Sequence, residues 1–322
     1  MASVSTTLPS DRSSAIRPGA AQFAWVVLIY ILGVIVWGAY VRASGSGAGC
    51  GNHWPLCNGE VIPTSPRTQM LIEFTHRVTS GLALVSVLAM LVWTWRATIR
   101  GAWARKAAVI AVVLMLNEAL LGALLVLLQH VGKDQSISRA VLLSLHLANT
   151  LLLIGSIALA AYWQTVSRDG SRYRKNNASF VVVGLLAAIG IGITGALAAL
   201  GDTLFPATSL RTSMAQDFSA GSFYLLRLRL LHPVVALIGT AFVIWIVARG
   251  FRSGSTAFRN LSIVVIVLAV VQVSLGVMNV VLLAPVWLQM THLLFADLFW
   301  IVLLLSFDEL LISRTEPAAS VA

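Results

Sequence analysis

Eight apolar runs of about twenty residues each constrain the fold of this chain more than any other feature. They lie at approximately 21–43, 69–95, 107–130, 140–163, 179–200, 225–248, 260–283 and 288–312. An α-helix needs about 20 apolar residues to cross a hydrocarbon core that is about 30 Å thick. The sequence therefore predicts an all-α integral membrane protein with eight transmembrane helices.

Charge and composition agree with this class. Only 11% of the residues are charged and the mean hydropathy is +0.88, whereas soluble domains carry roughly 25% charged residues. The net charge of +10 is compatible with nucleic-acid binding, but the basic residues lie in short loops between the apolar runs. We interpret them as topology signals and expect no nucleic-acid partner.

The positions of the basic residues also predict an orientation. Most of the 22 Lys and Arg residues lie in the N-terminal tail and in the loops after the even-numbered runs. Cytoplasmic loops carry the excess of positive charge, so tails 1–20 and 313–322 are both predicted to be cytoplasmic. Loops 44–68 and 201–224 then face outward.

The chain also has the pattern of a duplication, with one half at 21–163 and the other at 179–312. Four spans in each half give both halves the same orientation, as in parallel repeats. We expect two tandem four-helix bundles related by a pseudo-two-fold axis. Short matches between the halves are Gly38-Ala39 with Gly195-Ala196, and Leu121-Gly122 with Leu275-Gly276.

Each even-numbered run carries one histidine, five to nine residues from its outer start, which corresponds to a depth of ~8–13 Å. The four are His76, His146, His232 and His292. One membrane histidine is easily a packing residue, but four at one depth favour metal or haem ligation. Zinc usually takes carboxylate or thiolate ligands as well. We therefore expect bis-imidazole haem iron in each half, held by His76 with His146 and by His232 with His292.

The two halves differ beside these histidines. Glu73 stands three residues before His76, whereas Arg229 stands three before His232, and this spacing places each pair on one helix face. A protonatable group beside one macrocycle suits proton transfer or stabilisation of developing charge. The first half is therefore the better candidate for reaction and the second for a retained cofactor. A salt bridge to Arg77 is the alternative explanation for Glu73.

Haem propionates need cationic partners, and arginine binds carboxylates in a bidentate way. The candidates near the outer face are Arg42, Arg77, Arg227 and Arg229. Snorkelling or contact with lipid phosphate explains any one of them equally well. Glu118 and Asp297 also lie within spans, where interhelical hydrogen bonding accounts for them as well as a functional role does.

The two cysteines, Cys50 and Cys57, lie in the first outward loop, in an oxidising location that permits a disulfide. Such a disulfide would be either a structural staple over the first-half site or a redox-active pair.

Taken together, these motifs resemble the bacterial haem A synthases, and the resemblance covers the whole chain. The matching residues are Gly45-Ser46-Gly47, Cys50, Cys57, Gly59-Glu60-Val61-Ile62-Pro63, Glu73-Phe74-Thr75-His76-Arg77 and Gly81. The resemblance implies an enzyme that oxidises the C8 methyl group of haem O to a formyl group, which gives haem A for cytochrome oxidase. It also implies that Glu73 is required for the chemistry, that His76 and His146 serve the substrate haem, and that His232 and His292 hold a haem b cofactor.

The resemblance further implies a disulfide between Cys50 and Cys57 near the active site. Some members of that family have a second cysteine pair in the loop that corresponds to 201–224, and this chain has none. That loop must be ordered by other means, or it is looser. The implied partners are the lipid bilayer, haem O synthase, cytochrome oxidase assembly proteins, and an electron donor or acceptor that the sequence does not identify.

Two other functions fit parts of the pattern. One is a di-haem b electron-transfer or quinol oxidoreductase subunit, in which neither haem reacts. The other is a transporter built from parallel repeats, although its polar groups would usually lie at the midplane rather than near one face.

Overall fold

The computed structural model of the chain describes residues 18–166, 172–173, 177–219, 221–252 and 254–313. Eight helices among these residues are long and apolar enough to cross a membrane, which confirms the predicted spans. They are α1 (Pro18–Ala43), α2 (Thr68–Ala97), α3 (Trp103–Leu127), α4 (Ile137–Val166), α5 (Ala178–Leu204), α7 (Tyr224–Gly250), α8 (Thr256–Val281) and α9 (Val286–Leu311).

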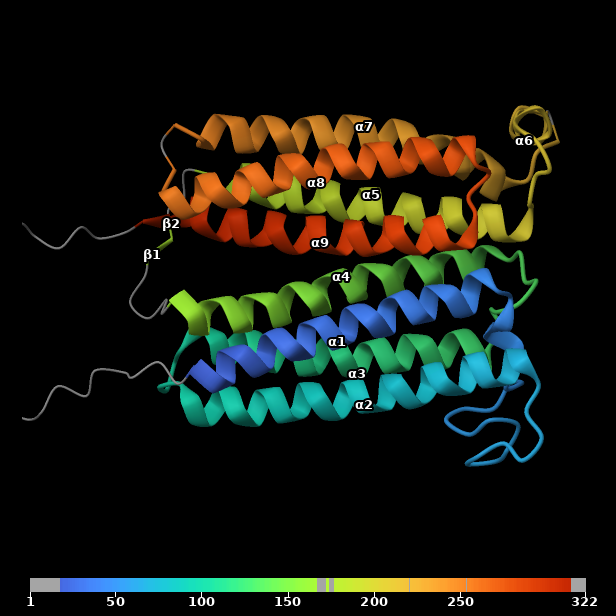
Figure 1. The fold of residues 1–322 in the computed structure, drawn as a ribbon, viewed down its shortest axis with the longest axis horizontal. Helices are drawn as coiled ribbons and strands as arrows, with labels where there is room; N and C mark the ends of the chain where they lie inside the picture. The colour runs from blue at the N-terminus through green and yellow to red at the C-terminus, as the bar shows by residue number, and fades with distance from the viewer. Residues whose placement is uncertain (1–17, 167–171, 174–176, 220, 253, 314–322) are drawn as a thin grey trace, which may run out of the picture.

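The helices form two bundles that lie side by side, α1–α4 in one and α5 with α7–α9 in the other (Figure 1). Helix α1 begins and α9 ends at the same end of the molecule, so the halves run in the same direction, as predicted for parallel repeats. The opposite end carries the Cys50–Cys57 loop and the short helix α6 (Leu210–Asp217). We call it the disulfide end.

The bundles meet where α1 and α4 pack against α5 and α9. Gly155 of α4 allows close approach, because a Cβ atom there would lie 2.8 Å from Leu304 Cδ2. Trp300 of α9 donates from Nε1 to the Leu151 carbonyl oxygen at 2.6 Å. Near the disulfide end, Arg42 of α1 reaches into the other half. One hydrophobic core therefore runs through both bundles.

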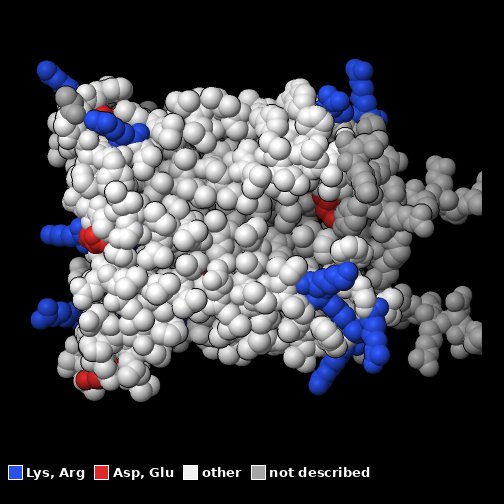
Figure 2. Space-filling view, turned by 180° about the vertical axis from the view of Figure 1, so that it is seen from behind, with Lys and Arg blue, Asp and Glu red and all other residues white. Residues whose placement is uncertain are grey.

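The outer surface of the bundles is apolar. Side chains such as Ile29, Leu186 and Ile238 are more than 60% exposed. Figure 2 shows Lys, Arg, Asp and Glu gathered toward the two ends of one face, with an almost entirely white band between them. A continuous apolar belt of this size is not stable against water, so it faces the hydrocarbon of a bilayer.

Four short elements of the described residues lie outside the predicted spans or at their edge. Helix α6 forms within the loop predicted at 201–224, and a 3-10 turn, η1 (Ser46–Ala48), precedes the first cysteine. Strand β1 (Arg172–Tyr173) pairs antiparallel with β2 (Ile312–Ser313), a small exception to the all-α prediction. Two-residue strands leave no periodicity in a sequence, which is why the pairing was not anticipated. Of the two predicted tails, Pro18 to Ala20 belong to α1, Ser313 belongs to β2, and the remaining residues lie outside the described residues.

Candidate functional site

A single cavity of about 1650 Å³ runs through both halves, and all four predicted histidines line it. His76, His146, His232 and His292 come from α2, α4, α7 and α9. Each of these helices begins at the disulfide end, and each histidine lies within its first three turns or so, at 3.6 residues per turn. The structure therefore places the four imidazoles in one layer, near one end of the bundles.

A glycine on a neighbouring helix faces each imidazole ring. The pairs are Gly38 with His76, Gly195 with His232, Gly122 with His146 and Gly276 with His292. The contact is tightest in the first two, where an added Cβ atom would lie 2.8 Å from His76 Cε1 and 3.0 Å from His232 Cε1. These glycines belong to the motifs duplicated in the sequence, so the duplication preserves the contact between glycine and ring.

Three of the four rings have a buried Nδ1 atom without a hydrogen-bond partner among the described residues, namely those of His76, His146 and His292. His232 Nδ1 instead lies 3.1 Å from Thr194 Oγ1. Buried polar atoms are normally paired, so these Nδ1 atoms need hydrogen-bond partners that the described residues do not supply in good geometry. Within the described part of the chain, no three His, Cys, Asp or Glu side chains form a group for a bare metal ion. The four histidines that line this mainly apolar cavity could hold a haem, whose iron binds imidazole.

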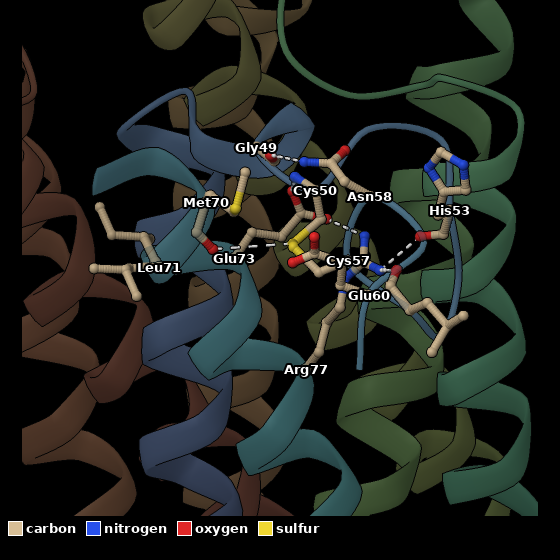
Figure 3. Close-up of a disulfide and its surroundings, with 12 residues drawn as sticks. Gly49, Cys50, His53, Cys57, Asn58, Glu60, Met70, Leu71, Glu73 and Arg77 are labelled. Carbon is tan, nitrogen blue, oxygen red and sulfur yellow. Dashed lines mark hydrogen bonds and ion pairs between the residues drawn. A yellow bond between two sulfur atoms is a disulfide. The ribbon is translucent and has the colours of Figure 1, made fainter. Parts of the chain in front are cut away.

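Glu73 lies in the wall of the same cavity and is 3% exposed. Figure 3 shows that it joins α2 to the cysteine loop. Its Oε2 atom accepts a hydrogen bond of 2.8 Å from the Cys50 backbone N–H, and its Oε1 atom forms an ion pair with Arg77. The salt bridge considered as an alternative from the sequence is therefore present, and the carboxylate also lines the cavity.

Arg77 anchors the loop on its other side. It donates to the carbonyl oxygens of His53 and Leu56, each at 2.6 Å. Cys50 and Cys57 form a disulfide, as expected, and both are buried. Thus Glu73, Arg77 and the disulfide form one connected unit over the first-half part of the cavity (Figure 3).

Glu118 of α3 is a site residue whose role the sequence analysis left open. Its Oε1 atom lies 3.4 Å from His146 Nδ1, and its Oε2 atom accepts a hydrogen bond of 2.5 Å from Asn149. The duplication in the sequence could have indicated that Glu118 belongs to the site. Glu118 precedes Gly122 by four residues, as Gln272 precedes Gly276 in the second half. Helical periodicity alone did not show which way Glu118 points.

The predicted propionate partners other than Arg77 lie mainly toward the second half. Arg42 donates to the Ala199 carbonyl oxygen at 2.7 Å and to Thr203 Oγ1 at 2.8 Å. Arg229 pairs with Asp202 at 3.0 Å and also with Asp217. Arg42, Arg77 and Arg229 line the cavity, whereas Arg227 is not among its lining residues.

The contact between Arg229 and Asp217 also helps to order the loop in which the second cysteine pair is missing. Asp217 closes α6, and Ser209 and Thr212 form a capping box at its start. Ion pairing and helix capping therefore order this loop.

Two further acidic residues differ in their place relative to the cavity. Asp297 of α9 is fully buried and lines the cavity, and neither carboxyl oxygen has a partner among the described residues. Asp134 lies outside the spans, between α3 and α4. Burial is the largest single influence and opposes its ionisation, but the hydrogen bonds with Ser136 and His130, together with the charge interaction with His130, outweigh it and lower the pKa of Asp134 below its usual 3.8.

The fold and the cavity define a class of protein: a polytopic membrane protein with duplicated four-helix halves and a histidine-lined internal site. More specifically, the chain belongs to the COX15-CtaA family, described as cytochrome oxidase assembly proteins, whose sequence profile matches residues 21–304.

Several curated relatives are similar to the chain. A "Protoheme IX farnesyltransferase" of Thermus thermophilus is 44% identical over 289 residues, which are 88% of this chain and 47% of that protein. The chain thus spans about half the length of that relative. A "Heme A synthase" of Alkalihalophilus pseudofirmus is 40% identical over 31% of this chain and 34% of the relative. Another "Heme A synthase", from Bacillus licheniformis, is 37% identical over 42% of this chain and 41% of the relative.

Proposed function

We propose that the protein is a haem A synthase, an oxidoreductase that converts the C8 methyl group of haem O to a formyl group. The observation that carries this proposal is the histidine-lined cavity, in which a different residue stands three positions before the first histidine of each half. Glu73 borders the first-half site, whereas Arg229, paired with two aspartates, borders the second. The names of two of the relatives, "Heme A synthase", support the same function.

In this proposal His76 and His146 hold the substrate haem, and His232 and His292 hold a resident haem b. When bound, the haem iron supplies the redox chemistry. The chain fixes the position of the reacting group. Glu73 is held from two sides, by Cys50 N–H and by Arg77, so its carboxylate has one defined position at the cavity wall. A fixed carboxylate of this kind suits proton transfer or stabilisation of developing positive charge.

The proposed reaction uses a substrate that a prenyl-transfer reaction must first produce. Haem O differs from protohaem by an added farnesyl-derived tail, so a farnesyltransferase must supply it. The similarity to about half of a protein named as a protohaem farnesyltransferase supports a functional link between the two reactions. Haem O synthase, cytochrome oxidase assembly proteins and an electron donor or acceptor are the proposed partners.

We place the protein in a bacterial cell membrane, with both termini cytoplasmic and the haem sites near the outer face. Arg96 and Arg105 lie near the end opposite the disulfide, where the positive-inside rule expects basic residues. A disulfide near the other end suits an oxidising compartment.

The test is haem analysis of membranes in which the full chain is expressed together with a haem O synthase. Extracted haems are separated by chromatography and identified by mass. We expect haem A with the wild-type chain, and accumulation of haem O with loss of haem A in Glu73→Gln. Glu60→Gln, which changes an exposed carboxylate of the same loop, is the matched control and keeps the wild-type profile.

Two results would overturn the proposal. An unchanged haem profile in Glu73→Gln removes the role of this residue. A wild-type chain that binds only haem b and forms no haem A supports the di-haem electron-transfer alternative.

A further inference from the structure

We propose that Glu118 is a positioning residue for His146 and accepts a hydrogen bond from the Nδ1–H of that ring. This hydrogen bond gives the His146 imidazole more anionic character than the His292 imidazole of the second half has. The inference rests on the proposed function, because it takes His146 as a haem ligand. It concerns a residue to which neither the sequence motifs nor the proposed chemistry assigns a role.

The first step is the protonation of the ring. A neutral imidazole carries one N–H, so a histidine that binds iron through Nε2 must carry its proton on Nδ1. That proton needs an acceptor, and outer acceptors of this kind orient metal-binding histidines and raise their basicity. His146 Nδ1 is buried and unpaired among the described residues, and Glu118 Oε1 lies 3.4 Å away. This separation exceeds a normal hydrogen bond by only a few tenths of an ångström.

The second step is that Glu118 is itself fixed. Asn149 donates from Nδ2 to Glu118 Oε2 at 2.5 Å, and the Thr150 hydroxyl donates to Oε1. Asn149 is held in turn by Asn117, which donates to its Oδ1 atom at 2.8 Å. The partners that the described residues supply to the carboxylate are donors, which is the arrangement that an ionised acceptor requires.

The third step compares the two halves. At the matching position in α8 stands Gln272, whose Nε2 donates to the His292 carbonyl oxygen at 3.0 Å. Gln272 Oε1 and His292 Nδ1 are both buried and unpaired among the described residues. The second half therefore offers a neutral amide where the first half offers a carboxylate.

The consequence is electrostatic. A carboxylate behind one ligand favours the oxidised, more positive state of the site, and so lowers its reduction potential relative to a site with an amide. Glu73 is neutralised by its ion pair with Arg77, and Arg229 is paired with two aspartates, so these residues do not add to the effect. The difference between Glu118 and Gln272 favours the oxidised state in the half that we propose reacts.

A reciprocal exchange tests this inference. Glu118→Gln gives the first half the residue of the second, and Gln272→Glu does the reverse. The purified full chain is loaded with haem b as the probe, and both sites are followed by redox titration and by electron paramagnetic resonance. We expect Glu118→Gln to raise the first-half potential and Gln272→Glu to lower the second-half potential. Each tenfold change in the preference for oxidised over reduced haem corresponds to about 59 mV.

Controls separate charge from structure. Glu118→Asp keeps the charge and should retain most of the wild-type potential, whereas a purely structural role would be disturbed by the shorter side chain. If Glu118→Gln does not retain haem, the inference is tested with Gln272→Glu alone. An unchanged reduction potential of the second-half haem in Gln272→Glu would then contradict it.

The inference and the proposed function fail in different ways. A loaded and folded Glu118→Gln protein with unchanged potential and unchanged resonance spectrum leaves Glu118 as an interhelical hydrogen-bond partner, and removes this inference only. A wild-type chain in which His146 binds no haem removes both.

Discussion

Arg77→Met is the sharpest perturbation of the unit that positions Glu73. Methionine keeps much of the length of the side chain but removes the ion pair with Glu73 and the hydrogen bonds to the His53 and Leu56 carbonyl oxygens. The cysteine loop then loses its main polar anchor to α2. Glu73, with a side chain that is 5% exposed, then keeps the Cys50 N–H as its one polar partner among the residues that the structure describes.

The size of the effect follows from these contacts. Hydrogen bonds to charged groups contribute roughly 1.5–3 kcal/mol each, and removing one partner of a buried ion pair costs roughly 3–5 kcal/mol. These values are not additive, and Arg77 retains 11% exposure. We therefore take about 3 kcal/mol for the local opening of the loop. At about 1.4 kcal/mol for each factor of ten, opening becomes roughly a hundredfold more frequent.

Reduction of the disulfide reports this opening. Cys50 and Cys57 are 0% and 1% exposed, so a thiol reagent reaches the sulfur atoms only after the loop moves. The rate of reduction by dithiothreitol, measured by alkylation and mass analysis, should rise roughly a hundredfold in Arg77→Met. Arg67→Met is the matched control, because Arg67 is an exposed residue at the start of α2. Its rate should stay within about twofold of the wild type. A rise of less than about fivefold in Arg77→Met would refute the view that Arg77 holds the loop closed.

Two further predictions concern the ring contacts and the loop between α3 and α4. Gly195→Ala should displace the imidazole it faces and lower the haem content of the second half, because the added Cβ atom would lie 3.0 Å from a ring carbon. Gly190→Ala in the same helix meets nothing within 4 Å and should leave the haem content unchanged; equal loss in both variants would contradict the contact. The pKa of Asp134 lies below 3.8 in the folded chain, so its ionised carboxylate stabilises the loop between α3 and α4. This stabilisation is fully present above pH 3.8 and is lost as the pH falls through the lowered pKa. The difference in thermal midpoint between the wild type and Asp134→Asn should therefore shrink as the pH falls from about 5 toward the lowered pKa, whereas a difference that does not change over this range would contradict this.

The sequence predicted the bilayer-spanning architecture because its signal is local. Runs of apolar residues set the eight helices, and the even number of spans in each half set their parallel direction. The histidine layer was predictable for the same reason, since depth along a helix depends only on counting residues. The glycines of the duplicated motifs were visible as a repeat, but their contact with the histidine rings depends on how the helices pack.

What the sequence left open depends on the rotation and docking of helices. Whether Glu118 faces His146 is decided by the rotation of α3, and a nearly uniform apolar sequence does not determine it. The reach of Arg42 into the other half depends on how the two bundles dock. Helix α6 was missed because it is short and polar, and its capping box alone marks its start.

The central claim is that each half holds one haem between two histidines. Its most direct test is the haem content and absorption spectrum of the purified full chain, compared with those of His146→Ala and His292→Ala. The account predicts bis-histidine haem in the wild type, with each substitution removing the haem of its own half and leaving the other half loaded. A protein that purifies without haem absorbance, or one in which neither substitution changes the spectrum, would contradict it.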